Sequence, residues 1–174
     1  MAFDLSSVLG QFTGGKSSPD VHNDFQTVAE NAPSDMLSKG LSAMFSSPQT
    51  PPFGQMAGQL FGRAAPNQQA GMLSQLLGGM GPSVLASLAS GVGGGALGNM
   101  LSRFGGGGST PVVTPDQASQ LTPADVETVA NHAEQHSPGI IDKMSEFYAQ
   151  HPGLVKTLGG AALTVAMAKM AEQR

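Results

Sequence analysis

The chain contains no cysteine among its 174 residues. This absence excludes disulfide bonds, thiolate metal sites and cysteine nucleophiles, and nothing in the composition requires an oxidising compartment. The N-terminal stretch MAFDLSSVLGQF also carries the acidic Asp4 where a secretory signal would need Lys or Arg before its apolar segment. We therefore expect a cytoplasmic protein.

Large aromatic side chains are scarce as well, since the chain has no tryptophan and a single tyrosine. Hydrophobic residues make up 40% of the sequence, but much of that share is Ala and Met. The 24 glycines represent about twice the usual proportion. Because a few large side chains usually dominate burial, this core must rely on Leu, Met and Phe and on close approach of backbones.

Charge is the third shortage, because Asp, Glu, Lys and Arg together form only 11% of the chain and the net charge is −4. No excess of Lys and Arg is present to neutralise phosphates, so we expect no nucleic-acid partner. The longest uncharged run lies between Arg63 and Arg103. Pro66 and Pro82 interrupt this run, so it is not predicted to span a membrane, which requires about 20 predominantly apolar residues.

What the chain does have is helical periodicity along most of its length. The segment 34–45 is typical, because one stripe of the predicted helix is apolar: Met36, Leu37, Leu41, Met44 and Phe45. Further along, LTPADV combines Thr122 as N-cap, Pro123 at the first helical position and Asp125 at the third, which is a capping box. We predict an all-α fold of small helical bundle units joined by Gly-rich linkers.

The sequence GGGGST at 105–110 is predicted to be a flexible hinge, because consecutive glycines lose much entropy when they become ordered. It divides the chain into two parts, and four segments are expected along the chain in all. These are an N-terminal helical segment (1–31), a Gly/Met/Leu-rich helical region (32–104), a flexible linker (105–114) and a C-terminal unit of three to four helices (115–174).

Residues 10–17, GQFTGGKS, match the phosphate-binding P-loop pattern GxxxxGK(S/T) through Gly10, Gly15, Lys16 and Ser17. A P-loop must run from a buried strand directly into a helix whose N-terminus faces the phosphate. Here the preceding residues have helical periodicity, and Pro19 follows where the helix should continue. We therefore predict the C-terminal end of an amphipathic helix followed by a linker, and no nucleotide site.

Glycines repeat at helical spacing and form candidate helix-packing surfaces. Gly54, Gly58 and Gly62 make a GxxxGxxxG stripe, and shorter pairs follow at Gly91 and Gly95 and at Gly94 and Gly98. Such stripes allow two helices to approach closely. We favour tight packing within the chain as their role, with homo-oligomerisation, membrane contact or simple low complexity as the alternatives.

His132 and His136 lie four residues apart on the capped helix, and Asp125 lies seven residues before His132. The three side chains share one stripe, and that spacing can seat a metal ion. The HExxH motif is absent, because Glu134 follows His132 by two residues and lies on another face. A solvated polar flank is the favoured interpretation, and these residues are the only metal candidates.

No combination of Ser, His and acid is recognisable as a catalytic site, because Ser and Gly are too frequent for any pairing to be meaningful. A close-set pair of carboxylates is also missing, since Asp142 and Glu146 most simply flank Lys143 as surface charge. We predict no catalytic residues, no cofactor and no enzymatic activity.

Several segments resemble a known group of proteins. The opening FDLSSVLGQF with its following Gly pair, the Leu/Gly-rich LLGGMG and GVGGGALGNML, and the TPADVETVANH helix look like the uncharacterised, mostly helical bacterial proteins of the YidB-like group. The block FYAQHPGLVKTLGGAAL resembles C-termini of hypothetical proteobacterial proteins of similar layout. The resemblance implies a bacterial source and an all-α fold, and it transfers no catalytic residues.

From these features we predict a non-enzymatic helical protein that interacts with itself or with another protein through Gly grooves and Met/Phe/Leu faces. Met-rich faces adapt readily to partners. The alternative is peripheral association with a membrane surface through the Gly-rich central helices or the apolar C-terminal helix.

Overall fold

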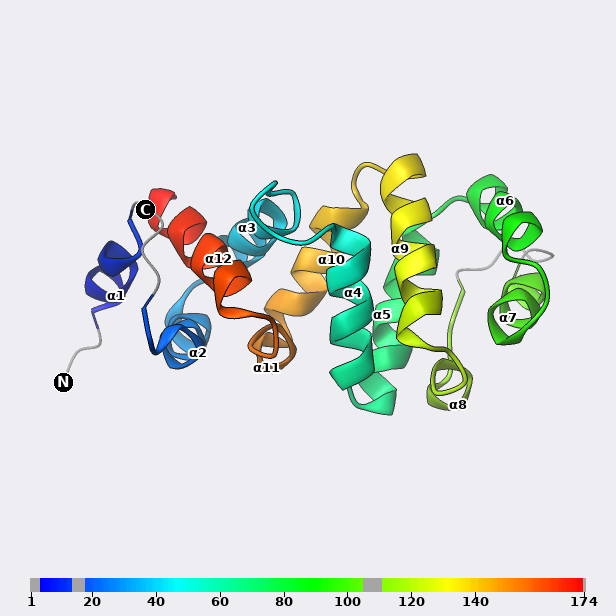
Figure 1. Ribbon diagram of the computed structural model, residues 1–174, viewed down its shortest axis with the longest axis horizontal. Helices are drawn as coiled ribbons and strands as arrows, with labels where there is room; N and C mark the ends of the chain where they lie inside the picture. Colours follow the sequence, from blue (N-terminus) through cyan, green and yellow to red (C-terminus); the bar gives the residue numbers. More distant parts are fainter. Residues whose placement is uncertain (1–3, 14–17, 105–110, 174) are drawn as a thin grey trace. The chain divides into compact units, whose positions relative to one another are not determined.

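The computed structural model describes residues 4–13, 18–104 and 111–173, and within these residues the chain forms twelve helices and no strand. The helices are α1 (Leu5–Gln11), α2 (Val21–Asn31), α3 (Ser34–Phe45), α4 (Phe53–Arg63), α5 (Pro66–Gly79), α6 (Pro82–Val92), α7 (Ala96–Phe104), α8 (Pro115–Ala118), α9 (Pro123–His136), α10 (Ile140–Ala149), α11 (Pro152–Val155) and α12 (Gly160–Glu172) (Figure 1). The predicted all-α fold is confirmed.

The predicted capping box is present at the start of α9. The Thr122 hydroxyl oxygen accepts a hydrogen bond from the backbone N–H of Asp125 at 3.2 Å, and the Thr122 N–H donates to Asp125 Oδ2 at 2.9 Å. The box satisfies two backbone donors that the first turn of any helix leaves without partners. The capping sequence thus places the start of α9 correctly from local chemistry alone.

The chain divides into two compact units, and the division is not linear along the sequence. Unit 1 comprises Met1–Pro52 and Ser145–Arg174, and unit 2 comprises Phe53–Met144. The reason is helix packing, because α12 packs on α2 and α3, whereas α8 and α9 pack on α5 and α4. The predicted boundary at a linker over 105–114 therefore differs from the observed grouping.

The segment that follows the predicted hinge belongs to unit 2, as does the segment before the hinge. Residues 105–110 lie outside the described residues, but the following segment is placed, and the backbone N–H of Val113 donates to Ser74 Oγ of α5 at 3.0 Å. Ala118 of α8 is fully buried. Contacts of this kind attach the segment from residue 111 onward to unit 2.

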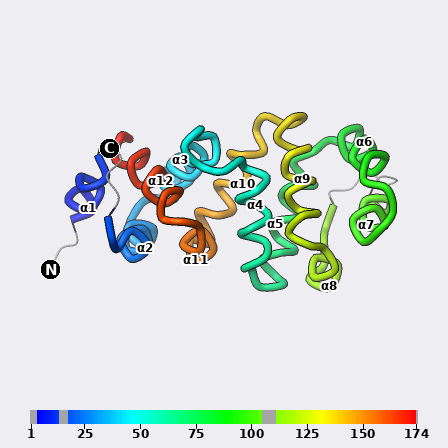
Figure 2. The backbone as a smooth tube through the Cα atoms, viewed as in Figure 1, coloured from blue at the N-terminus to red at the C-terminus, as the bar shows by residue number. Residues whose placement is uncertain are grey.

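Unit 1 is built around the last helix. Figures 1 and 2 show α12 running beside α2 and α3, with α1 close to it. The backbones of α3 and α12 approach closely at Gly40, where an added Cβ would meet Ala166 O at 3.1 Å and also the Met170 side chain. The core of this unit includes Leu9, Phe12, Phe25, Val28, Leu41, Met44, Leu163, Met167 and Met170.

Unit 2 is centred on α4, α5 and α9, with α8 packed on α5 and with α6 packed on both α7 and α9. Its interior is made largely of Leu and Met side chains and two phenylalanines. The buried residues include Phe53, Met56, Leu60, Phe61, Met72, Leu73, Leu76, Leu77, Val126 and Val129. Leu, Met and Phe therefore form the core, which agrees with the scarcity of larger aromatic residues.

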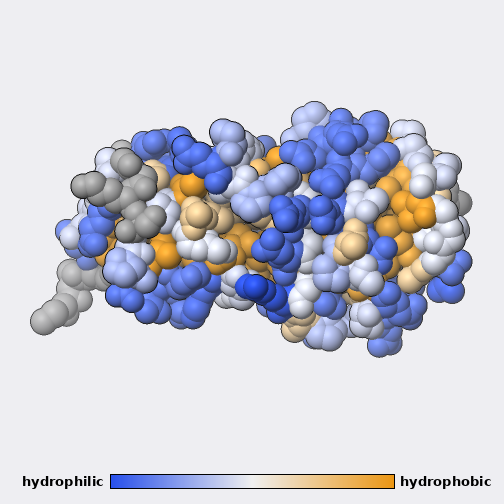
Figure 3. Space-filling view, viewed as in Figure 1, coloured by the Kyte–Doolittle hydropathy of each residue, from blue (hydrophilic) through white to orange (hydrophobic). Residues whose placement is uncertain are grey.

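The surface of the described residues is mostly polar or small. Figure 3 shows hydrophilic residues over much of the viewed face, with hydrophobic residues visible between them. Val112, at 72% exposure, is the one large hydrophobic side chain classed as exposed among the described residues. No single helix in the described chain is long and apolar enough to cross a membrane, although α5 and α6, bent by 114°, pass that test as a pair on length and composition.

Tyr148 of α10, the only tyrosine in the chain, is fully buried in unit 1. Its ring lies 5.5 Å from that of Phe45 and 5.6 Å from that of Phe147, measured between centroids. No described protein atom forms a hydrogen bond with its hydroxyl group. Burial raises the pKa of this hydroxyl well above its usual value of about 10, because the phenolate would lose its hydration.

The burial of Tyr148 predicts that the free energy of unfolding falls at alkaline pH. Tyr148→Phe should remove this pH dependence. In the unfolded chain Tyr148 releases its proton near pH 10, whereas the folded chain retains it. Above about pH 10 the unfolded state therefore binds fewer protons, and the free energy of unfolding falls by up to about 1.4 kcal/mol per pH unit. Denaturant titrations at a series of pH values measure the free energy of unfolding. They should show this fall above about pH 10 in the native sequence and not in Tyr148→Phe.

The absorbance of the phenolate provides an independent measurement, because the chain has no tryptophan and no second tyrosine. We expect no phenolate signal from the folded protein near pH 11, and a full signal once denaturant has unfolded it. A reversible signal with an ordinary midpoint, while helicity is retained, would contradict the burial of this hydroxyl.

Candidate functional site

The glycine stripe of α4 faces α9, and the two helices run antiparallel. Gly54 near the start of α4 lies against Asn131, Gly58 lies against Pro123 and Glu127, and Gly62 lies against Pro123. An added Cβ at Gly58 would be only 2.7 Å from the carbonyl oxygen of Pro123, which belongs to the backbone. The stripe is therefore occupied by a helix of the same chain, in the arrangement that the sequence analysis favoured.

The later glycines lie in different surroundings. An added Cβ at Gly91, in α6, would meet no atom within 4 Å, and the same holds for Gly95, whose positive φ of 116° requires glycine. Gly98 of α7 lies against the carbonyl group of Gly93 in the turn before its own helix. The predicted Gly91, Gly95 and Gly98 surface thus contains no contact between two helices.

The histidines lie on the side of α9 that faces α6. His132 Nε2 lies 2.9 Å from Ser87 Oγ of α6, and the rings of His132 and His136 are 4.5 Å apart between centroids, with their planes inclined at 47°. His132 is half-buried and His136 is exposed. The i, i+4 spacing thus brings the two rings together, as expected on a helix.

Asp125 does not join the two histidines. Its Oδ2 accepts hydrogen bonds from the backbone N–H and the hydroxyl of Thr122, at 2.9 and 2.8 Å. Within the described part of the chain, no three His, Asp or Glu side chains converge in a way that could hold a metal ion. The three candidate ligands predicted from the sequence therefore reduce to a pair of histidines.

A groove of about 550 Å³ runs between α6 and α9 beside His132. One side is apolar and the other is polar. Its lining residues include Ser87, Leu88, Val92, Leu97, Asp125, Thr128, Asn131 and His132. The sequence does not reveal this groove, because its lining residues come from α6, α7 and α9, and α9 lies far along the chain from the other two.

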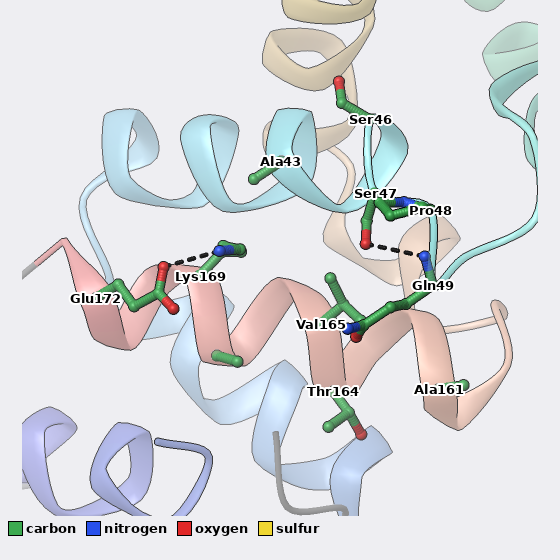
Figure 4. A pocket seen from close by; sticks show the side chains of 11 residues that line it. Ala43, Ser46, Ser47, Pro48, Gln49, Ala161, Thr164, Val165, Lys169 and Glu172 are labelled. Atoms are coloured by element: carbon green, nitrogen blue, oxygen red, sulfur yellow. Dashed lines mark hydrogen bonds and ion pairs between the residues drawn. The ribbon is translucent and has the colours of Figure 1, made fainter. Parts of the chain in front are cut away.

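A second groove, of about 620 Å³, lies within unit 1 between α12 and the segment that follows α3 (Figure 4). Small or short side chains line most of it. The residues are Ala43, Ser46, Ser47, Pro48, Gln49, Ala161, Thr164, Val165, Ala168, Lys169 and Glu172. The only sequence signal for this groove was the excess of alanine in the last helix, which also fits a fully buried helix.

The P-loop-like segment is only partly described. The predicted helix before it is present as α1, which ends at Gln11 and is followed by Phe12 as its C-cap. Gly14, Gly15, Lys16 and Ser17 lie outside the described residues. A helix therefore stands in the place where a P-loop requires a buried strand.

No protein-family model, curated protein or solved structure matches this chain. The resemblance to the YidB-like group therefore stays a prediction. A functional proposal has to rest on the geometry of the two grooves and of the side chains around them.

The glycine contact between α4 and α9 yields a matched pair of substitutions. In Gly58→Ala the new methyl group meets the backbone of α9, so we expect a loss of about 1–3 kcal/mol in the free energy of unfolding. Gly91→Ala adds the same methyl group on open helix surface, so stability should stay unchanged or rise by up to about 1 kcal/mol. Chemical denaturation compares the two, and equal effects would contradict the close contact.

Proposed function

We propose that this is a non-enzymatic, cytoplasmic bacterial protein that acts by binding a helical segment of a protein partner in the groove of unit 1. The observation that carries the proposal is a groove with a small-residue lining and a polar end, bounded by α12 and by residues 46–49. Sequence analysis expected Gly grooves and Met/Phe/Leu faces to be the interaction surfaces. In the described residues those side chains are mostly buried, which leaves this groove as the better candidate.

The lining of the groove favours a helix as the occupant. Ala43, Ala161 and Ala168 present only methyl groups, and small residues at a helix surface permit close approach of a second helix. The stretch of α12 from Ala161 to Glu172 is about 17 Å long, which corresponds to about three helical turns. An amphipathic helix with apolar residues at positions i, i+4, i+7 and i+11 spans about that length.

The wall formed by residues 46–49 is held by local hydrogen bonds. The hydroxyl of the buried Thr50 lies 2.6 Å from the carbonyl oxygen of Met44 and 3.0 Å from that of Ser47. The backbone N–H of Gln49 donates to Ser47 Oγ at 3.2 Å. A wall that is already ordered costs less conformational entropy when a partner binds.

The opposite end of the groove is charged. In Figure 4 the ion pair between Lys169 and Glu172, with 2.9 Å between Nζ and Oε2, lies away from the Ser47–Gln49 hydrogen bond. Both side chains are exposed enough to exchange this pair for charges of a partner, because an exposed i, i+3 pair contributes little by itself. A partner helix with one acidic and one basic residue near one end would match this charge pattern.

Membrane association through the central helices is the second candidate. The bent pair α5 and α6 meets the length and composition criteria for a broken span. However, Leu73, Leu76 and Leu77 of α5 are fully buried inside unit 2, so insertion into lipid would require this unit to open. Binding of a protein partner requires no such opening, and we therefore place it first.

Because the exposed Ala161 lines the groove of unit 1, we predict that a large side chain at this position blocks binding of a protein partner. Ala161→Arg places a long charged side chain in the groove, and it should abolish capture of a partner by the immobilised full-length chain. Ala86→Arg is the matched control, because Ala86 is also an exposed alanine in a helix and does not line either groove. Both variants should keep the helicity of the native sequence.

The measurement has two parts. Sedimentation velocity over a wide concentration range tests whether a second copy is the partner, and affinity capture from the native host tests for another protein. Support requires an association that Ala161→Arg removes and Ala86→Arg retains. A chain that remains monomeric, captures nothing that depends on Ala161, and floats with liposomes at low salt would instead favour the membrane alternative.

A further inference from the structure

The pair of histidines on α9 has a defined hydrogen-bonding partner. His132 Nε2 lies 2.9 Å from Ser87 Oγ, and Ser87 Oγ lies 2.9 Å from the carbonyl oxygen of Val84. A serine hydroxyl has one proton to donate, and a carbonyl oxygen can only accept. When the Ser87 proton is directed to Val84, Ser87 Oγ accepts a hydrogen bond from His132 Nε2.

In this arrangement the Nε2 atom of His132 carries the proton of the hydrogen bond to Ser87, and Nδ1 is the nitrogen left for a ligand. Histidines that bind metals commonly donate their other ring N–H to an oxygen, which sets the orientation of the ring and raises the basicity of the ligating nitrogen. Ser87 thus supplies His132 with the kind of partner that supports a metal ligand.

The separation of the two rings also fits a shared ion. Two imidazole nitrogens that bind one tetrahedral Zn²⁺ at about 2.0–2.1 Å are about 3.3 Å apart, and the ring centroids behind them are about 5 Å apart. The observed centroid separation of His132 and His136 is 4.5 Å, and the planes are inclined at 47° rather than stacked in parallel. This separation is compatible with both rings binding one ion after an adjustment of their side-chain torsions.

We propose that His132 and His136 together form a binding site for a divalent transition-metal ion of the Zn²⁺ class. His132 binds through Nδ1, and Ser87 acts as a positioning residue through Nε2. Imidazole nitrogen suits Zn²⁺, Cu²⁺ and Ni²⁺ better than it suits Mg²⁺ or Ca²⁺. With two protein ligands, the remaining positions of the ion are open to water.

The open positions distinguish this site from a structural zinc centre, which is normally closed by four protein ligands. The groove beside His132 gives small molecules access to the ion, and the oxygen atoms of Thr128 and Asn131 line the same groove. The site belongs to unit 2, whereas the proposed partner groove belongs to unit 1.

Zn²⁺ alone is the probe for the test, and the full chain without a purification tag is the protein. Isothermal titration calorimetry near pH 7.5 should show one Zn²⁺ per chain. Each of His132→Ala and His136→Ala should weaken binding by about tenfold or more. His22→Ala is the matched control, because His22 lies on α2 in unit 1 and should leave the affinity unchanged.

A second pair of variants tests the positioning role of Ser87. Ser87→Ala should weaken Zn²⁺ binding by about 10–100-fold, because His132 then lacks its hydrogen-bond partner. Ser90→Ala removes a comparable hydroxyl from the same helix, one that donates to the Ala86 carbonyl oxygen at 2.9 Å, and it should have no effect on Zn²⁺ binding. Circular dichroism checks that each variant remains folded, which we expect because none of these side chains is buried.

Two outcomes would overturn the proposal. One is undetectable binding by the native sequence up to about 1 mM Zn²⁺. The other is equal affinity in the native chain and in the double variant His132→Ala, His136→Ala, which would place the ion elsewhere. If Ser87→Ala binds as tightly as the native chain while the two histidine variants fail, the assigned tautomer is wrong.

Discussion

Close approach of helix backbones at glycine is the constraint on which both units depend. In unit 2 the carbonyl oxygen of Pro123 occupies the space that a side chain at Gly58 would need. In unit 1 Gly40 of α3 receives the Met170 side chain and the backbone at Ala166 of α12. A chain without tryptophan and with few aromatic residues lacks large side chains for burial, and contact between backbones compensates for part of that lack.

This use of glycine also decides which surfaces remain for partners. The glycine stripe of α4 packs against α9, which leaves Gly58 and Gly62 only at the border of a groove that Pro123 and Glu127 also line. On α12, Ala162, Ala166 and Ala171 are buried, whereas Ala161 and Ala168 border an open groove. Surface methyl groups in a preformed groove fit a protein segment, and this links the packing of unit 1 to the proposed function.

Local features of the structure could be predicted from the sequence. Helical spacing predicted the all-α fold, and the Thr122 and Asp125 capping box predicted where α9 starts. The same i, i+4 reasoning brought His132 and His136 together, because neighbouring turns of one helix place such side chains side by side. All of these depend on residues within a few positions of one another.

The sequence by itself determined the helices, their capping and the scarcity of large core residues, since each of these depends on composition or on neighbouring residues. Only the tertiary structure decided that α12 packs on α2 and α3, although the residues of unit 2 lie between them in the sequence. It also decided that the Asp125 side chain bonds to Thr122 and not to the histidines, and that Ser87 meets His132 from 45 residues away. Contacts over such distances depend on how helices pack against one another, and a helical repeat specifies which face of a helix is buried without specifying which helix covers it.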